Sequence, residues 1–89
     1  MNLTQIEIKK AIDLIPVKYK DQRQFINCID FLRHNELGLA LESLVELADE
    51  IDYSLPKDYW NNLIIAAEKM GLKKEADYCK LKLLDKKIG

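Results

Sequence analysis

The segment His34–Asp52, HNELGLALESLVELADEID, contains the most regular helical pattern in this 89-residue chain. Its apolar residues recur three, four and seven positions apart, which is the spacing of one face of an α-helix. They are Leu37, Ala40, Leu41, Leu44, Ala48 and Ile51, with Val45 and Leu47 widening the stripe. The pattern predicts a helix that begins near Leu37 and buries this stripe in the core.

The chain before this segment predicts two more helices. The first begins near Thr4, a capping residue, and ends at Ile15, because Pro16 disfavours helical geometry in the residue before it. The second begins after Asp21, another capping residue, and ends near Asn35, a fair helix terminator.

The chain after this segment predicts a second pair of helices. Pro56 suits the first turn of a helix that Gly71 ends, and a further helix covers about Lys73–Lys86. No stretch alternates with period two over more than a few residues, so no sheet is expected. The fold class predicted for residues 1–89 is all-α: a single domain, built as a compact bundle of about five helices with two helix hairpins plus an N-terminal helix.

The two predicted hairpins resemble each other weakly. Aligning Ala40 with Ala76 places Asn35 over Gly71, an offset of 36 residues. This offset is near the period of helix-pair repeats, although two pairs are too few for a solenoid.

Charge and hydropathy exclude several classes of function. The 14 basic and 15 acidic residues leave a formal net charge of −1, so the molecule has no overall field that would recruit nucleic acid. No apolar run is long enough to span a bilayer, and the first residues lack the pattern of a signal peptide. We therefore expect a cytoplasmic protein that binds neither nucleic acid nor membrane.

Candidate catalytic and metal-binding residues are sparse. Cys28 and Cys79 have no metal-ligand spacing, and each lies among apolar residues, so we expect two reduced thiols in the core. His34 is the only histidine, and no phosphate-binding glycine loop is present. The sequence therefore predicts no enzyme, no cofactor and no metal.

The acidic residues of the central helix are its most distinctive feature. From His34 to Pro56 the chain has six acidic residues and no Lys or Arg. Glu42, Glu46, Asp49 and Glu50 are expected on one side of the helix, opposite the apolar stripe, and Asp52 and Tyr53 follow in the next loop. This face is either an ordinary solvated surface, balanced by Lys and Arg from other helices, or a surface that fits a basic partner.

The segment Phe31–Leu72, FLRHNELGLALESLVELADEIDYSLPKDYWNNLIIAAEKMGL, resembles the small helical immunity proteins of bacterial toxin systems. The resemblance is to the MafI-type group and related contact-dependent-inhibition immunity proteins, and it covers about half the chain. The shared pattern is a short turn with Asn or Gly, then Ala-Leu-Glu-x-Leu, acidic residues, and a Pro-led helix ending in Met-Gly-Leu.

This resemblance implies a cytoplasmic antidote that binds one cognate toxin, often a nuclease, and blocks its active site or substrate groove. A nuclease presents cationic surface to phosphates, so an acidic helix can occupy that surface and associate rapidly. The candidate partner-binding residues are Glu42, Glu46, Asp49, Glu50 and Asp52, with Tyr53 as a possible aromatic anchor.

A tetratricopeptide-like adaptor or regulator is the alternative. Such a module would hold a peptide or protein partner between its helix pairs. It would tolerate changes of acidic to neutral residues and would be sensitive at groove residues, whereas the antidote hypothesis predicts the reverse.

Overall fold

The structure is a computed structural model that describes residues 2–51 and 55–88, with side chains up to residue 85. Its elements are α1 (Leu3–Asp13), the 3₁₀ helix η1 (Val17–Tyr19), α2 (Arg23–Arg33), α3 (Leu37–Ile51), α4 (Lys57–Lys69) and α5 (Lys73–Ile88). No strand is present among the described residues. The predicted all-α fold is confirmed.

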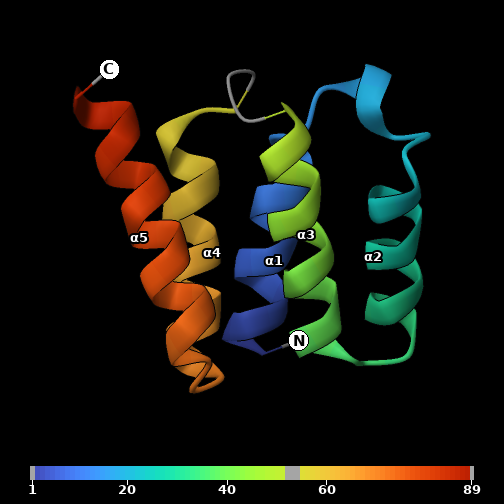
Figure 1. The fold of residues 1–89 in the computed structure, drawn as a ribbon. Coiled ribbons are helices and arrows are strands. Elements are labelled where there is room, and N and C mark those ends of the chain that lie inside the picture. The colour runs from blue at the N-terminus through green and yellow to red at the C-terminus, as the bar shows by residue number, and fades with distance from the viewer. Residues whose placement is uncertain (1, 52–54, 89) are drawn as a thin grey trace.

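The five helices form two hairpins with the N-terminal helix between them (Figure 1). One hairpin pairs α2 with α3, and the other pairs α4 with α5. The helix α1 packs chiefly against α4 and less extensively against α3, so direct contact between the two hairpins is slight. The molecule measures 37 × 30 × 18 Å. Its thin dimension corresponds to roughly two helix diameters.

The predicted caps of the first two helices were wrong. Asn2, not Thr4, caps α1: its side-chain oxygen accepts a hydrogen bond from the Gln5 backbone N–H (2.8 Å), and the Gln5 side chain accepts one from the Asn2 N–H (3.2 Å). This reciprocal pair satisfies two N–H groups that would otherwise lack partners. The helix α2 begins after Gln22 rather than Asp21, and no side chain caps it.

The turns inside the two hairpins have the same backbone geometry. Asn35 and Gly71 follow the last residues of α2 and α4 with positive φ, 56° and 71°. In each turn the next N–H donates back to a carbonyl five residues earlier, Glu36 to Phe31 (2.8 Å) and Leu72 to Ala67 (2.9 Å). Both turns are therefore Schellman motifs, and they lie 36 residues apart as the sequence alignment predicted.

The core joins all five helices and contains both aromatic residues of early α4. Trp60 and Tyr59 are fully buried and meet edge to face, with ring centroids 5.5 Å apart. The Tyr59 hydroxyl donates to the Leu44 carbonyl (2.6 Å) and so ties α4 to α3. Cys28 and Cys79 are free thiols with no exposed surface, which confirms their expected place in the core. Among the described residues, no helix has the length and apolar character that a bilayer crossing requires.

Candidate functional site: a groove between α3 and α5

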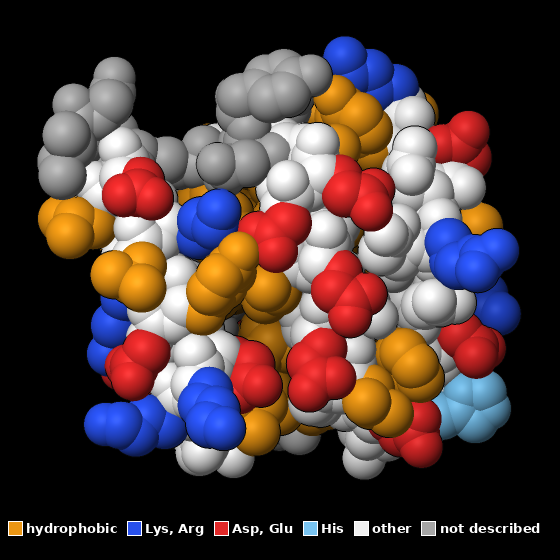
Figure 2. Space-filling model, in the orientation of Figure 1, with side chains coloured by type: hydrophobic (Ala, Val, Ile, Leu, Met, Phe, Trp, Pro, Cys, Tyr) orange, Lys and Arg blue, Asp and Glu red, His pale blue; other side chains and the backbone are white. Residues whose placement is uncertain are grey.

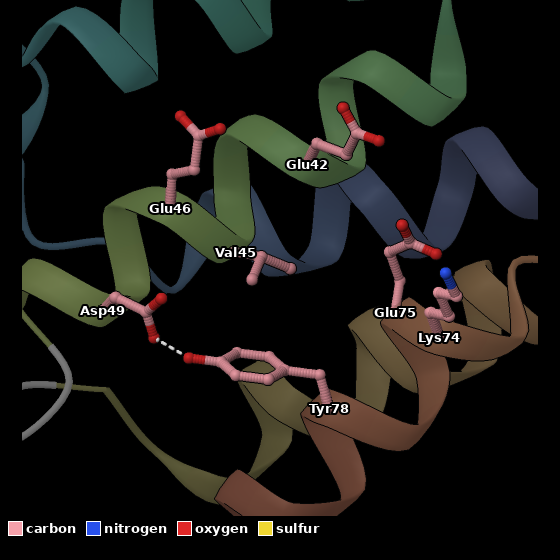
Figure 3. Close-up of a pocket in the computed structure, with 7 residues that line it drawn as sticks. All are labelled: Glu42, Val45, Glu46, Asp49, Lys74, Glu75 and Tyr78. Atoms are coloured by element: carbon pink, nitrogen blue, oxygen red, sulfur yellow. Dashed lines mark hydrogen bonds between the residues drawn. The ribbon is translucent and has the colours of Figure 1, made fainter.

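The candidate site is a shallow groove of about 330 Å³ between α3 and α5 (Figure 3). The groove exists because α3 packs mainly on α2 while α5 packs mainly on α4. The side chains that line it are Glu42, Val45, Glu46 and Asp49 from α3, and Lys74, Glu75 and Tyr78 from α5. We call this set the α3–α5 groove.

Helical spacing explains why these residues come together. Positions 42, 45, 46 and 49 are three, four and seven residues apart, so they share one face of α3 beside its buried stripe. Positions 74, 75 and 78 follow the same rule on α5, next to the buried residues Ala76 and Cys79. Both rows border the core, so each contributes half-buried as well as exposed side chains.

The surface inside the groove is mostly carbon, although five of its seven lining residues are charged. Val45 is half-buried, packs against the core and points into the space between α3 and α5 (Figure 3). The ring of Tyr78 lies on the opposite side and reaches toward α3. A ligand in this groove would therefore meet carbon atoms inside and charged groups at the rim.

Asp49 closes one end of the groove by joining the two helices. The Tyr78 hydroxyl donates to its carboxylate (2.5 Å), and Lys82 Nζ lies 3.6 Å from the same oxygen. Lys82 Nζ also lies 5.5 Å from the centre of the Tyr78 ring. The bond to the carboxylate favours the protonated phenol, so the pKa of Tyr78 is raised.

The rim of the groove carries two carboxylates that have no protein partner among the described residues. Glu42 and Glu46 are exposed, and neither has a hydrogen-bond or ion-pair partner in the described part of the chain. Some acidic residues elsewhere in the described chain do have partners, such as Glu68, whose carboxylate lies 3.0 Å from Lys80 Nζ. Figure 2 shows acidic side chains running down the middle of this face over α3, with hydrophobic surface beside them. The groove lining as a whole has four carboxylates and one lysine.

The structure divides the predicted partner-binding residues into three groups. Glu42, Glu46 and Asp49 line the groove. Glu50, one helical turn after Glu46, does not line it and instead accepts a hydrogen bond from the Gln24 side chain of α2 (2.7 Å). Asp52 and Tyr53 lie outside the described residues. The acidic row of α3 therefore borders the groove with three of its residues and contacts α2 through the fourth.

Val45 was expected only as part of the apolar stripe, and three further groove residues were not predicted at all: Lys74, Glu75 and Tyr78. They lie on α5, whose mixed charges looked like an ordinary solvated surface. Their positions beside Ala76 and Cys79 were a usable signal, because residues that flank a buried stripe line the seam with a neighbouring helix. What the sequence did not indicate is that this neighbour would be α3.

The thiols and the histidine of the described chain are not arranged as a catalytic site. Burial raises the pKa of Cys28 to about 12 and that of Cys79 to about 12, so both remain protonated thiols at neutral pH. His34 is exposed at the end of α2, where its Nδ1 lies 2.9 Å from the Asp30 carbonyl oxygen. No group of three or more His, Cys, Asp or Glu within residues 2–51 and 55–88 is placed to hold a metal ion.

Comparisons with known proteins do not assign this site. No protein-family model matches the chain, and neither the curated proteins nor the solved structures contain a match.

Proposed function

We propose that this protein is a cytoplasmic immunity protein that binds and neutralises a basic bacterial toxin, a nuclease being the expected class. The α3–α5 groove is its contact surface. The observation that carries the proposal is the pair Glu42 and Glu46, two exposed carboxylates without partners in the described fold, at the rim of a mostly apolar groove.

Electrostatics favours a basic partner for this surface. The whole molecule has a formal charge of only −1, so any attraction must come from local charge. Like charges four residues apart on a helix, as at Glu42 and Glu46, cost a few tenths of a kcal/mol, which a cationic partner would offset. A toxin that binds phosphates presents such cations, and their attraction would raise the association rate at low salt.

The geometry refines which acids belong to the proposed surface. Glu50 already accepts a hydrogen bond from Gln24, and Asp49 is held by Tyr78 and Lys82. The free carboxylates of Glu42 and Glu46 are therefore the main contacts, and Glu75 from α5 joins them. A stable complex buries roughly 800 Å² on each partner, so the groove would be the centre of a larger interface.

A peptide-binding adaptor is the second candidate, and the apolar lining of the groove favours it. Mutating acidic residues on the one hand and groove residues on the other does not distinguish the two functions, because Glu42, Glu46 and Asp49 belong to both sets. They differ instead in the partner. An antidote binds a folded toxin and abolishes its toxicity, whereas an adaptor binds a short linear segment.

The test is a rescue assay. The product of a neighbouring toxin-like gene is expressed in cells with and without this protein, and the pair is then captured by affinity purification. The proposal predicts restored growth and a stoichiometric complex. Unimpeded toxicity with no complex would contradict it and would direct the search to peptide partners.

A further inference from the structure

We propose that the α3–α5 groove accepts an arginine side chain presented by the partner protein. This inference rests on the proposed function and adds to it the chemical group that the groove recognises. A volume of about 330 Å³ is at the small end of the range for ligand pockets, roughly 300 to 1,000 Å³, and suits one long side chain rather than a folded element.

The inside of the groove fits the apolar part of arginine. Val45 and the Tyr78 ring offer carbon surface on its two sides, one from each helix. Arginine buries its three methylenes along such surface while its charged end stays at the rim. Its flat guanidinium also stacks on aromatic rings. Lys82 Nζ already lies 5.5 Å from the centre of the Tyr78 ring, so this ring tolerates a nearby cation.

The rim fits the charged end of arginine. Glu42 and Glu46 come from α3, and Glu75 comes from α5 beside Lys74, so both helices place carboxylates at the groove, with that of Glu46 pointing away from α5 (Figure 3). A guanidinium has five N–H donors spread over a plane and can reach carboxylates in different directions, whereas an ammonium acts as a point charge. A ligand bearing a carboxylate would be repelled by the same rim. The groove therefore favours arginine within a polypeptide over lysine and over the free amino acid.

An NMR titration of the ¹⁵N-labelled full chain tests this inference without the toxin. The probe is Nα-acetyl-L-arginine methylamide, and its control is the citrulline analogue, which has the same shape without the charge. We expect saturable shifts at Val45, Glu46 and Tyr78 with a dissociation constant on the order of 1 mM, as for a ligand of this size. The citrulline analogue should bind about tenfold more weakly, because it lacks the charge-assisted hydrogen bonds.

A matched pair of variants localises the binding. Glu46→Gln removes a rim carboxylate and should weaken binding of the arginine probe about threefold, since one charged contact of several is lost. Glu50→Gln makes the same chemical change one turn further along the helix, at a residue that is bonded to Gln24 and does not line the groove, and should leave binding unchanged. The lysine analogue should bind the unchanged protein several-fold more weakly than the arginine probe.

Three results would overturn the inference: equal binding of the citrulline analogue, equal weakening by both variants, or tighter binding of free arginine than of the capped probe. The last would indicate a site for a small metabolite. The arginine titration and the rescue assay can fail independently of each other. Rescue without arginine binding would contradict only this inference, and arginine binding without rescue would contradict only the immunity function.

Discussion

The Tyr78 hydroxyl donates a hydrogen bond to the Asp49 carboxylate and thereby joins α5 to α3 across the end of the groove. Elsewhere α5 packs mainly on α4, and α3 packs mainly on α2. The bond therefore links the two hairpins directly on the face where α1 does not separate them. It also holds the Tyr78 ring against the groove, so it couples the stability of the bundle to the shape of the site.

Replacing Tyr78 by Phe removes this bond and keeps the ring. We expect a loss of about 1 kcal/mol in the free energy of unfolding, the usual magnitude for one hydrogen bond. Urea unfolding of both proteins at pH 7 measures the difference. Identical midpoints and slopes would show that the bond contributes nothing to stability.

The same variant has a predicted pH dependence. The pKa of Tyr78 is raised in the folded protein, mainly by its bond to Asp49. A raised pKa stabilises the fold at pH values below the unfolded pKa, near 10, and this contribution disappears as the pH rises through the folded pKa. The stability difference between the natural protein and Tyr78→Phe should therefore be constant from pH 7 to pH 9 and shrink above pH 10. A difference that grew with pH would contradict this assignment.

Two glycines in different settings, Gly71 in a hairpin turn and Gly38 inside α3, should respond oppositely to replacement by alanine. Gly71 has φ +71° and no atom within 4 Å of an added Cβ, so Gly71→Ala should destabilise the protein by about 1 kcal/mol through backbone strain alone. Gly38 lies inside α3, and a Cβ there would meet Leu72 Cδ1 at an ordinary 3.8 Å. Gly38→Ala should instead stabilise by up to about 1 kcal/mol, because alanine favours the helix. Thermal unfolding of the two variants should shift in opposite directions, and a shift in the same direction would refute the turn assignment.

The buried thiols predict how the protein behaves in alkali. Burial raises the pKa of Cys28 to about 12 and that of Cys79 to about 12, from an ordinary value of 9.0. Since the unfolded chain ionises its thiols first, both contribute stability below pH 9 and lose it between pH 9 and pH 12. The Cys28→Ala variant should therefore show a shallower decline of stability above pH 9.

Thiol reactivity checks the same account independently. A thiol reagent such as Ellman's reagent should react with neither cysteine of the folded protein at pH 8 and with both in urea, because the thiolate is the reactive form. Rapid reaction of either thiol in the native state would show that the core opens readily.

The sequence predicted the helices well because their signals are local. The apolar stripe from Leu37 to Ile51 matches the bounds of α3, and the aligned pair Asn35 and Gly71 occupies equivalent positions in two Schellman motifs. The cap of α1 was misplaced because Asn2 with Gln5 and Thr4 with Glu7 are competing capping patterns two residues apart.

The groove was harder to predict because it depends on long-range packing. Helical spacing placed Glu42, Glu46 and Asp49 correctly on α3, but it could not show that α5 would lie beside them or that Gln24 would bond to Glu50. The bond from Gln24 depends on how α2 packs on α3, and the place of α5 beside α3 depends on how the two hairpins pack around α1; nothing local in the sequence encodes either.

Reversing the rim charges should leave the fold intact. Glu42 and Glu46 are exposed and have no partner within the described residues, so Glu42→Lys/Glu46→Lys replaces one pair of like charges by another. We expect a change in unfolding free energy within about 0.5 kcal/mol, as for most surface substitutions. Circular dichroism and urea unfolding check this, and a large loss of stability would mean that the two acids serve the fold.

The most direct test of the partner surface is the association rate of this variant with the purified toxin, measured at low and at high salt. Our account predicts that Glu42→Lys/Glu46→Lys associates at least about tenfold more slowly than the natural protein at low salt, with the gap closing at high salt as the charges are screened. The control variant Glu50→Lys, at the position bonded to Gln24 outside the groove, reverses one charge instead of two and should slow association clearly less than the double variant does. An unchanged rate for the double variant at low salt would contradict the account and reduce the acidic rim to ordinary solvated surface.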